Sequence, residues 1–149
     1  MMDPALNDLL ADFPMIVTVP VQWGDQDAFG HVNNTVYLRW FESGRVDYFE
    51  RIGLSESMRR MRVGPILASI TCHYRKQVNF PDQIRIGTRV HKIGRSSMVL
   101  DHRIVSESSR AVVAEGVSTV VVFDYAKNQS VPVPDDIRQA ISQLEGKEF

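Results

Sequence analysis

One eleven-residue segment, GDQDAFGHVNN, gathers the side chains in this sequence that are best suited to chemistry. They are Asp25, Asp27, His31, Asn33 and Asn34. A helical pattern follows directly, and the start of a helix offers unpaired backbone N–H groups and a partial positive charge. Such donors stabilise a carbonyl oxygen that becomes negative, while a carboxylate on the other side of the carbonyl attacks its carbon or activates a water. The segment therefore indicates acyl transfer.

The same residues allow two other interpretations. In the first, Asp25 and Asp27 close Asx turns, and Asn33 or Asn34 caps the helix. In the second, both aspartates and His31 bind a metal, although no fourth ligand and no recognised metal spacing accompany them. We therefore expect no metal and leave the choice between turn and catalysis open at this point.

The helix that follows, predicted over 34–52, has one broad apolar face. The residues of this face recur at steps of three and four: Tyr37, Trp40, Phe41, Gly44, Tyr48 and Ile52. Asn33 or Asn34 supplies its N-cap, and Gly53 stops it.

The rest of the chain reads mainly as strands. Alternating apolar residues and turn signals predict strands over 15–23, 66–78, 83–93, 97–106 and 111–124. Pro20 places the first strand at an edge or a bulge. Short helices are expected within 1–13 and over 135–144, and 54–64 reads as a connection near the site. This pattern predicts an α+β fold in a single domain, 1–149, and a second subunit to cover the apolar helix.

Composition excludes several classes of protein. The 149 residues carry a net charge of −1, so no basic field attracts nucleic acid. The single cysteine, Cys72, permits no internal disulfide and is expected to be a small buried residue. We see no secretory signal and no apolar stretch of the ~20 residues that span a membrane, so a cytoplasmic protein is expected.

The run WGDQDAFGHVNNTVYLRWFESGR resembles the 4-hydroxybenzoyl-CoA thioesterase family of hotdog proteins. That family shows Asp-x-Asp-x-x-Gly, then a tyrosine, an acidic residue and an arginine, which correspond to Asp25, Asp27, Gly30, Tyr37, Glu42 and Arg45. The runs VNFPDQIRIGTRV and HKIGRSSMVLDH are similar to later elements of the family, so the resemblance extends over roughly 17–124.

The resemblance implies a hotdog fold, in which a five-stranded, mainly antiparallel sheet wraps one long central helix. It also implies a homodimer or homotetramer with the active site at the subunit interface. Asp27 would act as nucleophile or general base, and a backbone N–H near Asn34 would polarise the thioester carbonyl. No cofactor is implied beyond the coenzyme A of the substrate. His31 stands where the family usually has an apolar residue, and we hypothesise that it orients Asp27 or the attacking water, or else stabilises the loop.

The substrate-binding residues that we predict are Asn33, Tyr37, Glu42, Arg95, Ser96 and Ser97. Arg95 and the two serines form a polar turn that suits phosphate, which the resemblance assigns to coenzyme A. Each prediction has a structural alternative: a helix cap for Asn33, a core position for Tyr37, an ion pair with a helix arginine for Glu42 and a polar hairpin tip for the turn.

The function predicted from the sequence is hydrolysis of an acyl-CoA thioester. A hotdog hydratase or dehydratase and a non-catalytic acyl-CoA-binding module are the alternatives. The sequence does not determine which acyl chain is preferred or whether the carrier is coenzyme A or acyl carrier protein. It also leaves open whether Asp27 is nucleophile or base, and how many subunits assemble.

Overall fold

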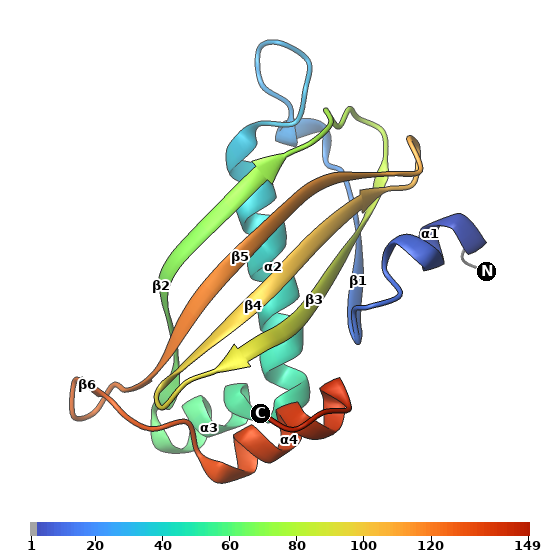
Figure 1. Cartoon of the computed structure of the whole chain (residues 1–149). Coiled ribbons are helices and arrows are strands. Elements are labelled where there is room, and N and C mark those ends of the chain that lie inside the picture. The colour runs from blue at the N-terminus through green and yellow to red at the C-terminus, as the bar shows by residue number, and fades with distance from the viewer. Residues whose placement is uncertain (1–2) are drawn as a thin grey trace.

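A long helix and a curled sheet form the frame of the molecule. In the computed structural model, which describes residues 3–149, α2 (Asn34–Ile52) lies along one face of an antiparallel sheet (Figure 1). The strand order is β1-β3-β4-β5-β2, and a two-residue strand, β6, pairs with β5. This arrangement is the predicted α+β hotdog fold.

The strands are β1 (Met15–Pro20), β2 (Val63–Tyr74), β3 (Gln83–Ile93), β4 (Ser97–Ser106), β5 (Ala111–Asp124) and β6 (Gln129–Ser130). The other helices are α1 (Pro4–Leu9), α3 (Leu54–Met61) and α4 (Asp135–Glu145). The predicted bounds of α2, β3, β4 and β5 are confirmed at both ends, because clear periodicity and turn residues mark them. Strand β1 lies at an edge of the sheet, as Pro20 indicated.

Three segments differ from their prediction. Strand β1 ends at Pro20, and a 3-10 turn over Trp23–Asp25 follows it. Strand β2 begins and ends earlier than 66–78. The segment 54–64, predicted as a connection, contains α3, which Gly53 separates from α2 by adopting φ 86°. The two arginines in the last turn of α3 suit a helix C-terminus.

The chain itself buries the large apolar residues of α2. Tyr37, Trp40, Phe41 and Tyr48 are at most 5% exposed, whereas Val46 on the outer side of the helix is 58% exposed. The expectation that these aromatic residues need a second subunit for cover is therefore wrong. The sheet curls far enough round the helix, with β1, α3 and α4 at its sides, to bury them alone (Figure 1).

The second edge of the sheet is open. Along β2, one side pairs with β5 and the other has no strand partner within the described residues. Ile66, Leu67 and Tyr74 on this strand are 41%, 44% and 46% exposed. A long, partly apolar edge strand is a template for pairing with another chain.

A polar cluster lies in the core between α2 and the sheet. Arg45 donates to Oγ of Ser118 at 3.0 Å, and a ring nitrogen of His102 lies 2.8 Å from the same oxygen. All three residues are buried, and the His102 ring stacks on Phe41 with centroids 4.8 Å apart. Burial, with a smaller contribution from Arg45, lowers the pKa of His102 to about 3, so this histidine is neutral in the folded protein.

Candidate active site

A hollow of about 390 Å³ lies at one end of the sheet, beside the start of α2. Four of the predicted site residues line it: Asp27, His31, Asn34 and Tyr37. The opposite wall is the end of β2 with the residues that follow it, 74–77. The loop after β1, the first turn of α2 and the edge strand therefore meet at one place.

The loop holds Asp27 through its backbone. Its N–H donates to the carbonyl of His31 at 2.8 Å, its carbonyl accepts from Gly30 at 3.1 Å, and Gly30 adopts φ 81°. Oδ1 of Asp27 accepts the N–H of Phe29 at 2.8 Å. No hydrogen bond to Oδ2 forms anywhere in residues 3–149. One carboxylate oxygen thus closes an Asx turn, as the structural interpretation expected, while the other remains available to a substrate.

Asp25 has a structural role in the same loop. Its Oδ2 accepts the N–H of Gln22 at 2.8 Å and so closes the 3-10 turn, and its carbonyl accepts the N–H of Asn33 at 2.9 Å. Asp25 therefore shapes the approach to α2 but does not line the hollow.

The first turn of α2 leaves one amide free. Oδ1 of Asn33 accepts the N–H of Thr35 at 2.9 Å, and the carbonyl of Asn33 accepts the N–H of Val36 at 3.0 Å. Asn33 is therefore the N-cap, while its predicted contact with substrate stays a prediction. The N–H of Asn34 has no hydrogen-bond acceptor in the part of the chain that the structure describes. An unpaired amide at a helix start that borders a hollow can donate to a carbonyl oxygen.

His31 and Tyr37 complete the predicted residues in the hollow. The His31 side chain is partly buried and forms no hydrogen bond with Asp27, or with any other described residue, so its orienting role stays a prediction. Tyr37 is 3% exposed, and burial raises the pKa of its hydroxyl to about 12. This tyrosine belongs to the core and also forms the floor of the hollow.

Glu42 lies elsewhere on α2. It is exposed on the outer side of the helix, where it borders a separate depression with Val17 and Val46. The expected ion pair with Arg39 or Arg45 is absent from the described residues. Glu42 does weakly raise the pKa of Arg45, which burial lowers more strongly. The structure therefore does not bring Glu42 to Asp27 within one chain.

The turn of Arg95, Ser96 and Ser97 lies at the far end of the sheet. Strand β3 starts near the loop that holds Asp27, where Gln83 pairs with Pro20, and runs eleven residues before the turn. At about 3.3 Å per residue, the turn is on the order of 30 Å from the hollow. Figure 1 shows the loop before α2 and the β3–β4 turn at opposite ends of the molecule.

The site residues predicted from the sequence do not include Tyr74, Arg75 or Lys76. All three line the hollow, and the hydroxyl of Tyr74 donates to the carbonyl of Asn34 at 2.9 Å. No local pattern marks them, since the predicted strand runs past them to residue 78 and 40 residues separate Tyr74 from Asn34.

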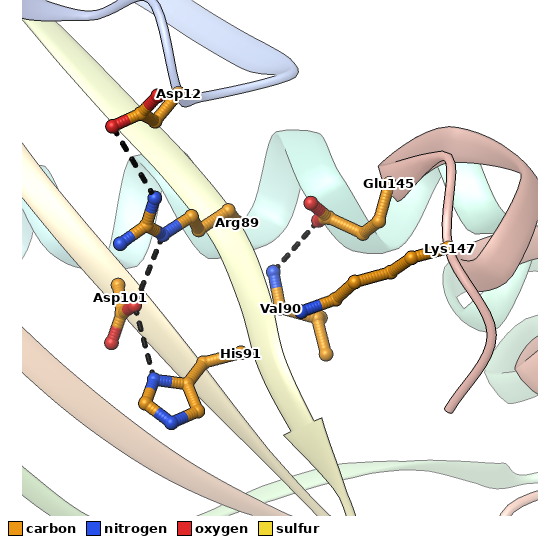
Figure 2. Close-up of a pocket in the computed structure, with 7 residues that line it drawn as sticks. All are labelled: Asp12, Arg89, Val90, His91, Asp101, Glu145 and Lys147. Carbon is orange, nitrogen blue, oxygen red and sulfur yellow. Dashed lines mark hydrogen bonds and ion pairs between the residues drawn. The ribbon is translucent and has the colours of Figure 1, made fainter.

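A second hollow, of about 430 Å³, lies between β3 and the end of α4. Figure 2 shows Arg89 bound to Asp101 at 3.0 Å and to Asp12 at 3.9 Å, with Asp101 also 3.3 Å from His91. These charges satisfy one another, which indicates a structural cluster. Among residues 3–149, no three potential ligands from His, Cys, Asp and Glu are grouped to hold a metal. None of the described helices is long and apolar enough to cross a membrane.

Known proteins resemble this chain in both sequence and fold. The thioesterase-like superfamily model matches residues 21–141. A thioesterase from Thermus thermophilus, solved with coenzyme A and zinc, is 30% identical, with a TM-score of 0.82 over 93% of this chain and 98% of that one. The long-chain acyl-CoA thioesterase FadM of Escherichia coli is 25% identical over 79% of this chain and 89% of its own length.

A third relative is the chloroplastic acyl-acyl carrier protein thioesterase ATL3 of Arabidopsis thaliana. It is 24% identical over 82% of this chain and 64% of its own length. The family model covers most of the sequence, and the fold matches that of a solved thioesterase over nearly its whole length. The chain therefore belongs to the thioesterase-like superfamily and is a thioester hydrolase with the hotdog fold.

Proposed function

We propose that this chain hydrolyses acyl-CoA thioesters in the hollow between Asp27 and the start of α2. One observation carries the proposal: the same hollow is lined by Asp27 and by Asn34. Within the described residues, Asp27 has a carboxylate oxygen without a partner, and Asn34 has a backbone amide without one. A base or nucleophile facing an oxyanion donor is the minimum that acyl transfer requires.

In the first route, Asp27 takes a proton from water as the water oxygen bonds to the thioester carbon. The carbonyl oxygen becomes negative and accepts from the N–H of Asn34. When the carbonyl re-forms, the carbon–sulfur bond breaks and the thiolate leaves with a proton from the carboxylic acid. In the second route, the carboxylate attacks the carbon itself, the carbon–sulfur bond breaks and the thiolate leaves, which gives a mixed anhydride. Water then hydrolyses the anhydride to the free acid, which restores the Asp27 carboxylate, and the released proton neutralises the thiolate. Both routes use the same two groups.

The carrier end of the substrate meets basic residues. Coenzyme A carries several phosphate charges, and Arg75 and Lys76 lie at the hollow. Arg75 has only a long ion pair, 3.8 Å, with Glu115. Because relatives act on both acyl-CoA and acyl-acyl carrier protein, the free coenzyme and the carrier protein are compared directly in the test below.

We further infer that two copies pair along the open edge of β2. An antiparallel pairing places the start of one β2 beside the end of the other. Within one chain, Val121 pairs with Ser97 on one side and with Ile66 on the other. The Arg95 turn is therefore two strands, roughly 10 Å, from the start of β2. Pairing would bring this turn of one subunit towards the hollow of its partner, where a long coenzyme spans both.

The experiment is release of free thiol from short, long and aromatic acyl-CoAs and from an acyl carrier protein thioester. Asp27→Asn keeps an oxygen to accept from Phe29 but loses the carboxylate, so we expect kcat to fall about 10²- to 10⁴-fold. Asp25→Asn is the matched control, because its side chain closes a turn outside the hollow. Full turnover by Asp27→Asn would refute the mechanism. Enoyl absorbance changing without thiol release would indicate a hydratase, and binding without either reaction would indicate a binding module.

Mixing two inactive or weakened chains tests the shared site. A dimer of one Asp27→Asn chain and one Arg95→Ala chain contains one site with both wild-type residues and one site with neither. We expect the sites that hold both wild-type residues to turn over with the wild-type KM, so the mixture should be more active than either parent. A mixture that behaves as the sum of its two parents would contradict a coenzyme site formed by two subunits.

A further inference from the structure

Tyr74 connects the open edge strand to the start of the central helix. Its hydroxyl donates to the carbonyl of Asn34 at 2.9 Å, and its ring meets the Tyr37 ring edge to face, with centroids 5.0 Å apart. Both contacts lie at the hollow that Asp27 borders. Tyr74 is 46% exposed, so its ring is not a core residue in the single chain.

The contact falls on the residue whose amide is free. The peptide between Asn33 and Asn34, which carries the free N–H, is held because its carbonyl accepts the N–H of Val36 at 3.0 Å. The peptide after Asn34 is held because its carbonyl accepts from Tyr74. Asn34, which lines the hollow, is therefore fixed from both sides, while its own N–H stays unpaired within the described chain.

Helix formation alone does not require this hydrogen bond. A carbonyl oxygen has two lone pairs, so the Tyr74 hydroxyl adds to any bond that the carbonyl accepts inside the helix. At an exposed position, water replaces a lost hydroxyl at little cost in stability. Water does not, however, hold the first residue of the helix in one orientation, as the fixed tyrosine does.

Resting on the function proposed above, we propose that Tyr74 is a positioning residue for thioester hydrolysis. Its hydroxyl holds the first residue of α2 so that the N–H of Asn34 is aimed at the thioester oxygen as that oxygen becomes negative. Oxyanion donors act through their fixed placement, and small displacements of a reacting geometry cost large factors in rate. Tyr74 itself transfers no proton in this scheme and makes no bond to the reacting carbon.

The test is Tyr74→Phe, which keeps the ring against Tyr37 and removes only the hydroxyl. We expect kcat for the best acyl-CoA to fall roughly 10- to 100-fold, with KM and the melting temperature nearly unchanged. The pH profile of kcat/KM should keep its shape, because no titrating group of the reaction is removed. An altered profile would instead assign Tyr74 an acid–base role and overturn the positioning role.

Tyr48→Phe is the matched control at the other end of the same helix. Tyr48 is fully buried, and its hydroxyl donates to Oε2 of the partly buried Glu145, far from the hollow of Asp27. We expect the opposite result: a lower melting temperature with kcat unchanged. If Tyr74→Phe gives that pattern, or raises KM alone, Tyr74 serves stability or ground-state binding and the inference is wrong.

The two proposals fail in different ways. A wild-type protein that releases no thiol from any acyl-CoA or carrier-protein thioester overturns the proposed function and the role of Tyr74 together. A wild-type protein that turns over, with a Tyr74→Phe variant of equal kcat, overturns only the role of Tyr74.

Discussion

Gly44 of α2 lies directly against Thr88 of β3, and a Cβ added at Gly44 would overlap Oγ1 of Thr88. It would also come within 3.1 Å of Ile86. The missing side chain therefore sets how closely the central helix approaches the sheet. That approach places the polar cluster of Arg45 and the aromatic core at their observed depths.

Gly44→Ala should consequently destabilise the protein. Because the overlapping atoms belong to buried strand residues, we expect a loss of about 1–3 kcal/mol in the free energy of unfolding, measured by urea denaturation. Adding Thr88→Ala to the variant should restore part of the loss. Gly24→Ala is the control, because an added Cβ there meets nothing within 4 Å. Equal stability of Gly44→Ala and wild type would contradict the close contact.

His102 should make stability depend on pH. Burial lowers its pKa from 6.5 to about 3 in the folded chain, so the unfolded chain binds a proton at a higher pH than the folded one. The contribution of neutral His102 to the free energy of unfolding is complete above pH 6.5 and is lost as the pH falls from 6.5 towards 3. Between pH 7 and pH 5, where most carboxylates remain ionised, this single group should cost about 2 kcal/mol of unfolding free energy.

The measurement compares urea unfolding at these two pH values in wild type and in His102→Gln. The variant should lose less stability between them than wild type does. His73→Gln, at an exposed position on β2, should keep the wild-type slope. If His102→Gln also keeps it, another group is responsible for the pH dependence.

Glu145 should anchor the end of α4. Its Oε2 accepts the hydroxyl of Tyr48 at 2.5 Å and the N–H of Val90 at 2.8 Å, and the second of these contacts is drawn in Figure 2. Glu145→Ala leaves both donors without this partner, so we expect the free energy of unfolding to fall by about 1–3 kcal/mol. Turnover per folded molecule should stay the same, because Glu145 lines the hollow beside β3, which is separate from the hollow of Asp27.

Lys147→Ala provides the comparison, since its side chain borders the same hollow and its ammonium contacts only the Phe149 ring among the described aromatic residues. Thermal melting should show little change for this variant. A Glu145→Ala protein that melts like Lys147→Ala would show that α4 is held by its apolar side alone.

The open edge of β2 should decide assembly. Leu67→Lys places a charge in the middle of that strand, where paired chains would bury it, so we expect the proposed dimer to dissociate and activity to fall with it. Light scattering coupled to gel filtration gives the mass. Thr18→Lys charges the other edge strand, β1, and should leave the mass unchanged. A Leu67→Lys protein with wild-type mass would place the interface elsewhere.

The sequence by itself determined most of the regular elements and the loop that we propose as the active site. The apolar positions from Tyr37 to Ile52 repeat at helical spacing, and the alternation in β3, β4 and β5 is bounded by turn residues, so local periodicity was sufficient. It also placed Asp27 just before a helix start, because the loop and the helix are adjacent in the chain. The segment that became α3 was missed, since its eight residues are too few for a clear period.

Only the tertiary structure decided which distant residues join that loop. Tyr74 reaches Asn34 because β2 ends beside the start of α2, whereas the Arg95 turn is carried to the far end of the sheet by the length of β3. Local spacing cannot show either result, because both follow from strand order and register. The same holds for His102, whose pKa depends on burial against Phe41 and Arg45 that no stretch of sequence around it reveals.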